Sequence, residues 1–290
     1  MDKLRYVGTD EPLTTEQGLV LRERIILAAK RAMVGRKLLP TTAALGEGAT
    51  TYGYDTLTDV SDARIDYGWP GAESLDIVNL ARTKVDIPNI HREFEINKLD
   101  LAASRRNGTP LNLSVAESAT YKVAKKEDEL ILQGWKRNGT YEINGLYNAA
   151  NNNENSNLDW GTATNIPISI TAAIKLMLED DIMPPYNLVL HPQQWANALT
   201  LIGTSAMGYL TWIRETIQGE VYQTGAMTNG TGLLSKANPE GMFEYIPAED
   251  LTLKTETLQK SENLWGKIFI RALPVVYNAN ALCKLSDIGT

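Results

Sequence analysis

The sequence predicts an α+β fold in which long helices, a β-rich segment and a set of closing strands follow one another along 290 residues. Three observations predict it. Residues 123–147 read as a charged helix that runs into a short hairpin without a catalytic group. Residues 50–96 and 242–285 carry the alternation of apolar and polar residues that strands require. Together these patterns favour a scaffold rather than an enzyme.

The composition is that of an ordinary globular protein, with 43% hydrophobic and 22% charged residues, enough for one large domain or two smaller ones. The formal net charge is -7, and no block of five or more basic residues occurs, which argues against sequence-independent binding of nucleic acid. The lone Cys283 excludes an intrachain disulfide, and the first residues lack the pattern of a secretory signal, so a cytosolic location is expected.

The charged helix is predicted to begin at Ser114, because Glu117 follows three residues later and the two form a capping-box pattern. Apolar residues recur on one face, whereas the charged turn 125–129 is expected to face water or another subunit. Asn138-Gly139 is predicted to end the helix, and Asn144-Gly145 to form the turn of the hairpin.

A second helix is predicted over residues 14–34, with Gly35 just past its end. Leu21, Ile25, Ala28 and Ala32 form one apolar stripe. Val20 and Leu27 fall on the opposite side, between Arg24 and Arg31. Two explanations remain open: either this side meets a partner, or a later segment of the same chain covers it.

The β-rich segment predicts a long hairpin. Ala63, Ile65 and Tyr67 alternate with polar residues, a turn is expected at 68–71, and strands are expected at 77–85 and 90–96. Each face offers few apolar residues, so this ribbon would not be stable alone in water. Pairing with another subunit would stabilise it.

The second half of the chain predicts a small α/β unit followed by strands. The asparagine-rich segment 148–157 is expected to be a mobile loop, and the loop 203–208 is small and uncharged. Helices are expected at 169–181, 192–201 and 209–218, and strands at 187–191, 221–224, 232–236, 242–246, 251–257, 264–276 and 279–285.

Signals for catalysis are nearly absent. His91 and His191 have no second ligand at metal-binding spacing, and no nucleotide-binding or hydrolase motif occurs. The paired carboxylates at 127–129 and 179–181 are interpreted as solvated helical turns, and the six tryptophans as packing residues. A soluble enzyme with an unrecognised site is the competing hypothesis from another class.

Several short motifs resemble one family across residues 13–285. They are Val34-Gly35-Arg36-Lys37, the helix ending in 126–134, Gly145-Leu146, the strand 185–190 with Gln194-Trp195, and the segments 268–270 and 280–282. In this order they resemble the encapsulins, which are shell proteins with the HK97-like capsid fold of tailed phages.

The resemblance implies a division of the chain into an N-terminal arm and helix (1–49), an E-loop hairpin region (50–96), a P-domain with its spine helix (97–145), an A-domain (146–248) and closing strands that return to the P-domain (249–290). It also implies that one loop surrounds a pore at the symmetry axis. The residues of this loop are Gly203, Thr204, Ser205, Ala206, Met207 and Gly208. They carry no charge, so passage limited by size is expected.

The function implied by the resemblance is that of a non-enzymatic subunit of an icosahedral nanocompartment. Its partners would be copies of itself and a cargo enzyme, such as a ferritin-like protein or a peroxidase, docked near Val20, Arg24, Leu27 and Arg31. The alternative is a viral or proviral capsid protein whose interior meets DNA. Some encapsulins hold a flavin against an aromatic residue after the E-loop, but residues 95–101 contain no Trp or Tyr, so no cofactor is expected.

Overall fold

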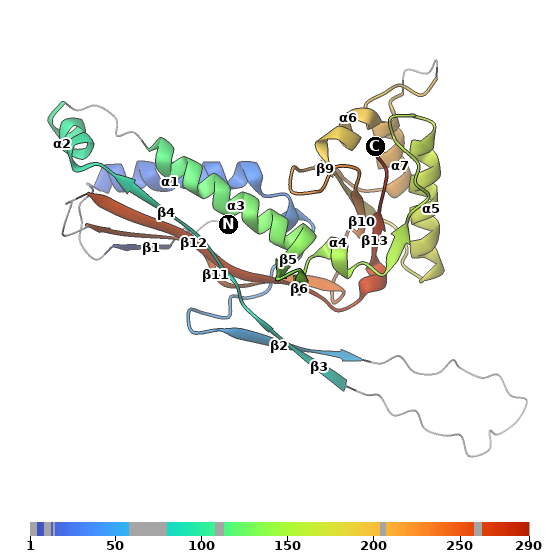
Figure 1. Cartoon of the computed structure of the whole chain (residues 1–290), viewed down its shortest axis with the longest axis horizontal. Helices are drawn as coiled ribbons and strands as arrows, with labels where there is room; N and C mark the ends of the chain where they lie inside the picture. The colour runs from blue at the N-terminus through green and yellow to red at the C-terminus, as the bar shows by residue number, and fades with distance from the viewer. Residues whose placement is uncertain are drawn as a thin grey trace, which may run out of the picture.

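The structure is a computed structural model that describes residues 5–8, 13, 15–57, 80–107, 113–203, 207–257 and 263–289. Its described elements form two bodies, each built on a β-sheet, and a two-stranded ribbon that extends away from both (Figure 1). The α+β prediction is confirmed, because helices lie against both sheets.

The first body is built on a four-stranded sheet in the order β1 (Arg5–Gly8), β11 (Phe243–Thr257), β12 (Leu264–Val276) and β4 (Asn89–Ile96). The antiparallel pair β11–β12 is its longest part and runs from Phe243 opposite Val276 to Thr257 opposite Leu264. β11 is one strand with two register shifts near Glu249, where the sequence predicted two separate strands. Such shifts bend a long strand without ending it.

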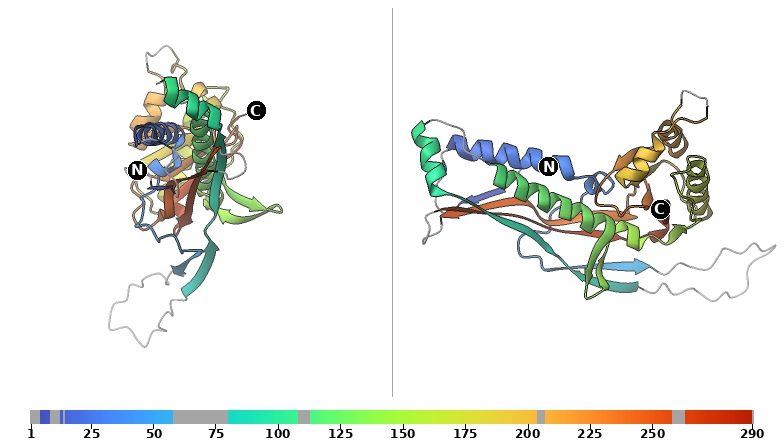
Figure 2. Two further views of the ribbon diagram at one scale, coloured as in Figure 1. Left: turned by 90° about the vertical axis from the view of Figure 1, so that its left-hand side faces the viewer. Right: turned by 45° about the horizontal axis from the view of Figure 1, so that its top comes forward.

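Two long helices lie side by side along one face of this sheet, α1 (Thr15–Ala32) and α3 (Ser114–Gln133) (Figure 2). α3 packs on β4 and β12, and α1 packs mainly on α3. The predicted stripe of α1 is confirmed where it is described, since Leu21, Ile25 and Ala28 are buried. A short helix, α2 (Lys98–Asn107), follows β4, and a 3₁₀ turn, η1 (Gly35–Lys37), follows α1.

The second body is the predicted small α/β unit with a five-stranded sheet. The strand order is β7 (Asn152–Glu154), β13 (Leu282–Leu285), β10 (Gly232–Lys236), β8 (Tyr186–Leu190) and β9 (Val221–Gln223). Every residue of β8 is buried, as its continuous apolar run predicts. The helices of this unit are α4 (Leu146–Ala149), α5 (Asn165–Glu179), α6 (Pro192–Ala198) and α7 (Tyr209–Ile217), and a 3₁₀ turn, η2 (Ala279–Ala281), precedes β13.

The ribbon consists of β2 (Thr51–Leu57) and β3 (Leu80–Asp86), paired antiparallel as the sequence predicts. The side chains of residues 51–55 and 81–86 are exposed or half-buried wherever they are described. At the base of the ribbon, Tyr54 meets the ring of Tyr277 edge-on at a centroid distance of 5.7 Å. The predicted strand around Ala63, Ile65 and Tyr67 and the turn 68–71 lie outside the described residues.

Each turn signal after α3 belongs one element later in the chain than the sequence analysis predicts. The helix ends at Gln133, because Gly134 has a positive φ of 78° and a Cβ there would overlap the carbonyl oxygen of Ile143. Asn138-Gly139 then forms the turn between β5 (Gly134–Arg137) and β6 (Thr140–Asn144), with φ values of 51° and 85°. Asn144-Gly145 instead leads into α4, where Gly145 is the N-cap.

Three further expectations are wrong. The capping box is out of register, since Leu113 occupies the N-cap position of α3 and its carbonyl accepts the N–H of Glu117. Segment 148–157 is not simply a loop, because it completes α4 and forms β7, which pairs with β13. The last strand, β13, joins the five-stranded sheet and not the sheet of β11 and β12, so the closing strands do not all return to one body.

Candidate functional site

The exposed side of α1 is the first candidate surface. Val20 and Leu27 are 49% and 53% exposed, and the neighbouring Leu19 is 54% exposed. These values favour the partner interpretation over coverage by the same chain, because no described segment buries the two side chains. Sequence reasoning missed Leu19, although it lies one residue before Val20 and belongs to the same exposed side.

The polar residues predicted beside this surface differ in what they contact. Arg24 is exposed and lies 3.5 Å from the carboxylate of Glu117 on α3, so it bridges the two helices. Arg31 lies in α1, but its side chain is outside the described residues. On α3, Tyr121 is half-exposed one turn after Glu117. α3 therefore contributes to the same side of the molecule as α1.

The loop predicted to line a pore is closed at its base. The N–H of Ile202 donates to the carbonyl of Met207 at 2.9 Å, and Leu201 forms a bridge with Gly208. Gly203 has a φ of 55°, which suits the start of such a tight reversal. Thr204, Ser205 and Ala206 lie outside the described residues. Leu199 and Leu201, just before the loop, are half-exposed.

Two acids of the charged turn of α3 are buried, which is the largest departure from the sequence analysis. Glu127 and Asp128 are each 1% exposed, so the prediction that this turn faces water or another chain is wrong for them. The backbone N–H groups of Val34 and Gly35 donate to the carboxylate of Asp128 at 2.9–3.1 Å. Their partners are thus in the same chain, more than 90 residues earlier.

Glu127 is held by a cation and a hydroxyl. Nε of Arg36 donates to its Oε1 at 2.8 Å, and the hydroxyl of Tyr245 donates to the same oxygen. Arg36 also lies over the ring of Tyr245, 4.8 Å from its centroid, and pairs with Asp250 at 2.8 Å. The other oxygen of Glu127, Oε2, has no hydrogen-bond partner among the described residues.

The electrostatics of this cluster follow from burial. The pKa of Asp128 is raised to about 7, mainly by burial and in smaller part by the neighbouring charge of Glu127, despite the two backbone donors that lower it. Burial also raises the pKa of Glu127, although Arg36 opposes the shift. The pKa of Arg36 is lowered by burial, but the attraction of Glu127 and Asp250 outweighs that effect and keeps it charged.

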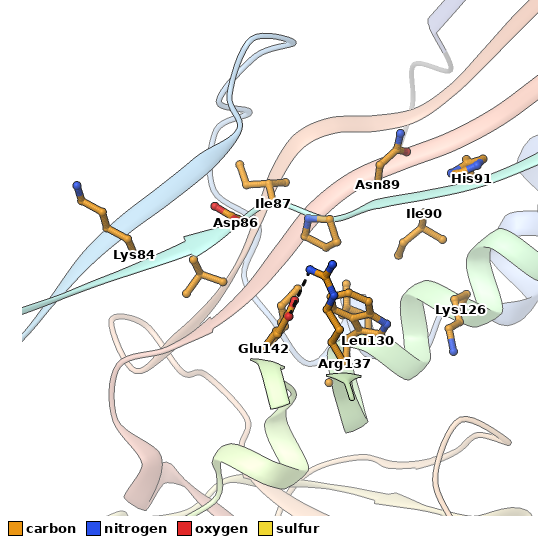
Figure 3. Close-up of a pocket in the computed structure, with 15 residues that line it drawn as sticks. Lys84, Asp86, Ile87, Asn89, Ile90, His91, Lys126, Leu130, Arg137 and Glu142 are labelled. Carbon is orange, nitrogen blue, oxygen red and sulfur yellow. Dashed lines mark ion pairs between the residues drawn. The ribbon is translucent and has the colours of Figure 1, made fainter. Parts of the chain in front are cut away.

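An open groove of about 690 Å³ lies between the base of the ribbon, α3 and the β5–β6 hairpin (Figure 3). Ile87, Ile90 and Leu130 form part of its apolar wall. Figure 3 shows Arg137 and Glu142 at one side, joined by an ion pair of 3.6 Å. The groove therefore combines an apolar wall with a charged pair, Arg137 and Glu142, at its edge. Surfaces that contact other proteins have this combination.

The described part of the chain offers no cluster of metal ligands and no activated thiol. Among the described residues, no set of three or more His, Cys, Asp or Glu side chains could hold a metal ion. Burial raises the pKa of the Cys283 thiol to about 12, which disfavours the nucleophilic thiolate. No described helix is long and apolar enough to span a membrane.

Comparison with known proteins identifies the family of this chain. A family model described as "Encapsulating protein for peroxidase" matches residues 5–260, which is most of the chain. The chain belongs to the encapsulin family.

Two curated encapsulins are similar in sequence. The type 1 encapsulin shell protein EncA of Myxococcus xanthus is 29% identical over 233 residues, covering 80% of each chain. The diheme-cytochrome-encapsulin shell fusion protein of Kuenenia stuttgartiensis is 27% identical over 205 residues, covering 71% of this chain and 55% of the fusion.

Solved structures give the same fold. The virus-like particle protein of Pyrococcus furiosus superposes with a TM-score of 0.69 at 14% identity, covering 94% of this chain and 99% of that chain. The capsid protein of Myoviridae phage XM1 gives a TM-score of 0.68 at 13% identity, covering 88% of this chain and 90% of that chain. The HK97-like fold predicted from the sequence motifs is therefore confirmed. The family match, and not the shared fold, shows that this encapsulin is a structural shell protein and not an enzyme.

Proposed function

We propose that the chain is the repeating subunit of a closed icosahedral nanocompartment that encloses a cargo enzyme. The family match over residues 5–260 carries this proposal. Three surfaces support it: the two-sided helix α1, the poorly buried ribbon β2–β3 and the groove between α3 and the β5–β6 hairpin. Each would gain its missing contacts in an assembly in which every subunit uses several interfaces at once.

The ribbon is the clearest case of a segment that needs a second subunit. Isolated two-stranded ribbons are marginal in water. The described side chains of this ribbon that pack on a buried apolar cluster are those of Tyr52, Tyr54 and Val85. We infer that the ribbon, within the predicted E-loop region 50–96, lies on a neighbouring subunit. A deletion of residues 58–79, which join β2 to β3 in the sequence, should then prevent assembly while leaving the chain folded.

The cargo would dock on the exposed side of α1. Val20 and Leu27 supply the apolar contact, and Arg24 and Arg31 supply charges. Glu117 and Tyr121 of α3 would border the same surface. A short peptide with apolar residues and at least one acid would match it, and the cargo would be a peroxidase or a ferritin-like protein. The loop 203–208 would surround the axial pore, with passage limited by size.

Leu27→Asp tests the docking surface. A carboxylate at this position should abolish loading of a co-expressed peroxidase or ferritin-like protein encoded beside the shell gene, while particles still form. Leu99→Asp is the matched control, because it places the same charge at an exposed leucine of α2. Loading is measured as the ratio of cargo to shell protein in purified particles, and unchanged loading in Leu27→Asp would exclude the surface.

The competing hypothesis of a viral capsid rests on the shared fold of the phage structures. Purified particles distinguish the two. A compartment should contain protein cargo and little nucleic acid, whereas a capsid packages DNA and is encoded beside terminase and portal genes. Particles filled with nuclease-protected DNA would favour the capsid and refute the compartment.

A further inference from the structure

The polar cluster under α1 ties the N-terminal arm to the spine helix. Along most of its length α1 packs through apolar side chains such as Leu21, Ile25 and Ala29. Just after the C-terminal end of α1, the contact with α3 changes from apolar packing to hydrogen bonds. There the two backbone N–H groups of Val34 and Gly35 reach the Asp128 carboxylate on α3.

The backbone after α1 lies very close to α3. Gly35 approaches α3 so nearly that a Cβ on it would lie 2.9 Å from Cγ2 of Ile131. Beyond η1, the arm continues along β11, where Thr42 donates its N–H to the carbonyl of Tyr245 at 3.0 Å. Arm, spine helix and β11 therefore meet around one buried pair of acids, Glu127 and Asp128.

The charges around this pair do not balance when both acids are ionised. Arg36 of η1 is the buried cation, and it contacts Glu127 directly. The remaining facing groups are Tyr245, which is neutral, and Asp250, which is partly exposed and negative, both on β11. Ionising both Glu127 and Asp128 would leave an excess negative charge in the core, a costly state.

We propose that Glu127 and Asp128 form a pH-sensitive latch on the N-terminal arm, closed while the pair retains one proton and weakened when both acids are ionised. The contacts that form the latch lie within one chain. The latch acts on the segment directly after α1, so it sets how firmly the C-terminal end of that helix is held against α3.

The direction of the pH dependence follows from the pKa of Asp128. This pKa is about 7 in the closed latch, compared with an ordinary value of 3.8. The closed form keeps its proton up to about pH 7, whereas an opened, solvated Asp128 loses it near its ordinary value. Opening therefore becomes easier as the pH rises through this window, about tenfold per pH unit, and levels off above it. The raised pKa of Glu127 acts in the same direction.

Hydrogen–deuterium exchange of the full-length protein tests the latch. Exchange of peptides covering residues 33–37 is measured from about pH 5 to pH 8, each divided by the exchange of the unfolded chain at the same pH. The protection factor of wild type should fall by on the order of fifty- to hundredfold across this range. Peptides of β8 should keep their protection, because they lie in the other sheet.

Two variants and one control decide the cause. Asp128→Asn cannot ionise but keeps an acceptor for both N–H groups, so its protection should be nearly independent of pH. Glu127→Gln removes the neighbouring charge and should move the midpoint to lower pH. Glu129→Gln is the matched control on the same helix, since Glu129 pairs with Lys126 in solvent, and should behave like wild type.

Three results would overturn the proposal: wild-type protection that changes less than about threefold, an Asp128→Asn variant that keeps the wild-type slope, or an equal loss of protection in β8. If Asp128→Asn does not fold, the wild-type profile and the Glu127→Gln midpoint remain decisive.

Discussion

Replacing Arg36 by methionine should destabilise the fold strongly and in a pH-dependent way. Methionine keeps an apolar stem but removes the guanidinium that lies 2.7–2.8 Å from Oε1 of Glu127. Because Glu127 is 1% exposed, its carboxylate would be left buried without a cation. Breaking a buried ion pair in this way costs about 3–5 kcal/mol.

Smaller contributions add to this cost. The contact of Arg36 with the Tyr245 ring is worth about 0.5–2 kcal/mol, and the pair with the partly exposed Asp250 at most about 1 kcal/mol. At acid pH Glu127 can take up a proton instead, which avoids the unpaired charge. The penalty should therefore be larger at about pH 8 than at about pH 5.

The assay is urea unfolding at both pH values, followed by the fluorescence of tryptophans that include the buried Trp160. A double variant, Arg36→Met with Glu127→Leu, is the control, because replacing both partners by apolar groups removes the unpaired charge. It should be more stable than the single variant. The reasoning is refuted if Arg36→Met costs under about 1 kcal/mol, or if the double variant is no better than the single.

Four other substitutions have defined outcomes. Gly35→Ala should lower stability by about 1–3 kcal/mol, since its Cβ would overlap Ile131; an unchanged melting temperature would show that α3 can move aside. Gly134→Ala should destabilise by at least about 1 kcal/mol, because φ is 78° there and its Cβ would also overlap the carbonyl oxygen of Ile143. Gly139 has a similar φ of 85° but open space around it, so Gly139→Ala should cost less; equal costs would contradict the role of close packing. Between about pH 5 and 8, Asp128→Asn should gain about 2–3 kcal/mol relative to wild type in urea unfolding, and a constant difference would contradict a raised pKa for Asp128.

The sequence predicted the elements whose patterns are local. The predicted ends of α1, β8, β12 and α7 lie within two residues of the observed ends, because apolar periodicity and proline or glycine signals define these elements without reference to the rest of the chain. The exposed side of α1 was likewise visible as Val20 and Leu27 at i, i+7 spacing, and the structure leaves both exposed.

What the sequence could not give depended on distant partners. Lys125 to Glu129 reads as a solvated turn, since five charged residues in succession are rarely buried. Only the fold brings Val34, Gly35 and Arg36 to Glu127 and Asp128, from more than 90 residues away. One local signal could have indicated this contact. In Val34-Gly35-Arg36 a glycine, which allows the backbone to approach closely, stands next to an arginine, which can pair with an acid on a helix.

For the asparagine-rich segment, the sequence predicted a loop where the structure has ordered elements. Residues 148–157 lack large apolar side chains, so local reasoning favoured a loop. In the structure, Asn152 donates to Asp180 at 2.8 Å and β7 pairs with β13, so hydrogen bonds order the segment in place of apolar burial. Such pairing depends on a strand more than 120 residues later and leaves no periodic signal.

The central claim is assembly into a closed shell, and the mass of the purified particle tests it most directly. Icosahedral symmetry requires about 60 copies or a multiple of this number, so a chain of 32.0 kDa predicts a particle of about 1.9 MDa or more. Light scattering coupled to size-exclusion chromatography, with electron microscopy of the same fraction, should give that mass and round closed particles. A monodisperse species of tens to a few hundred kilodaltons would contradict the account.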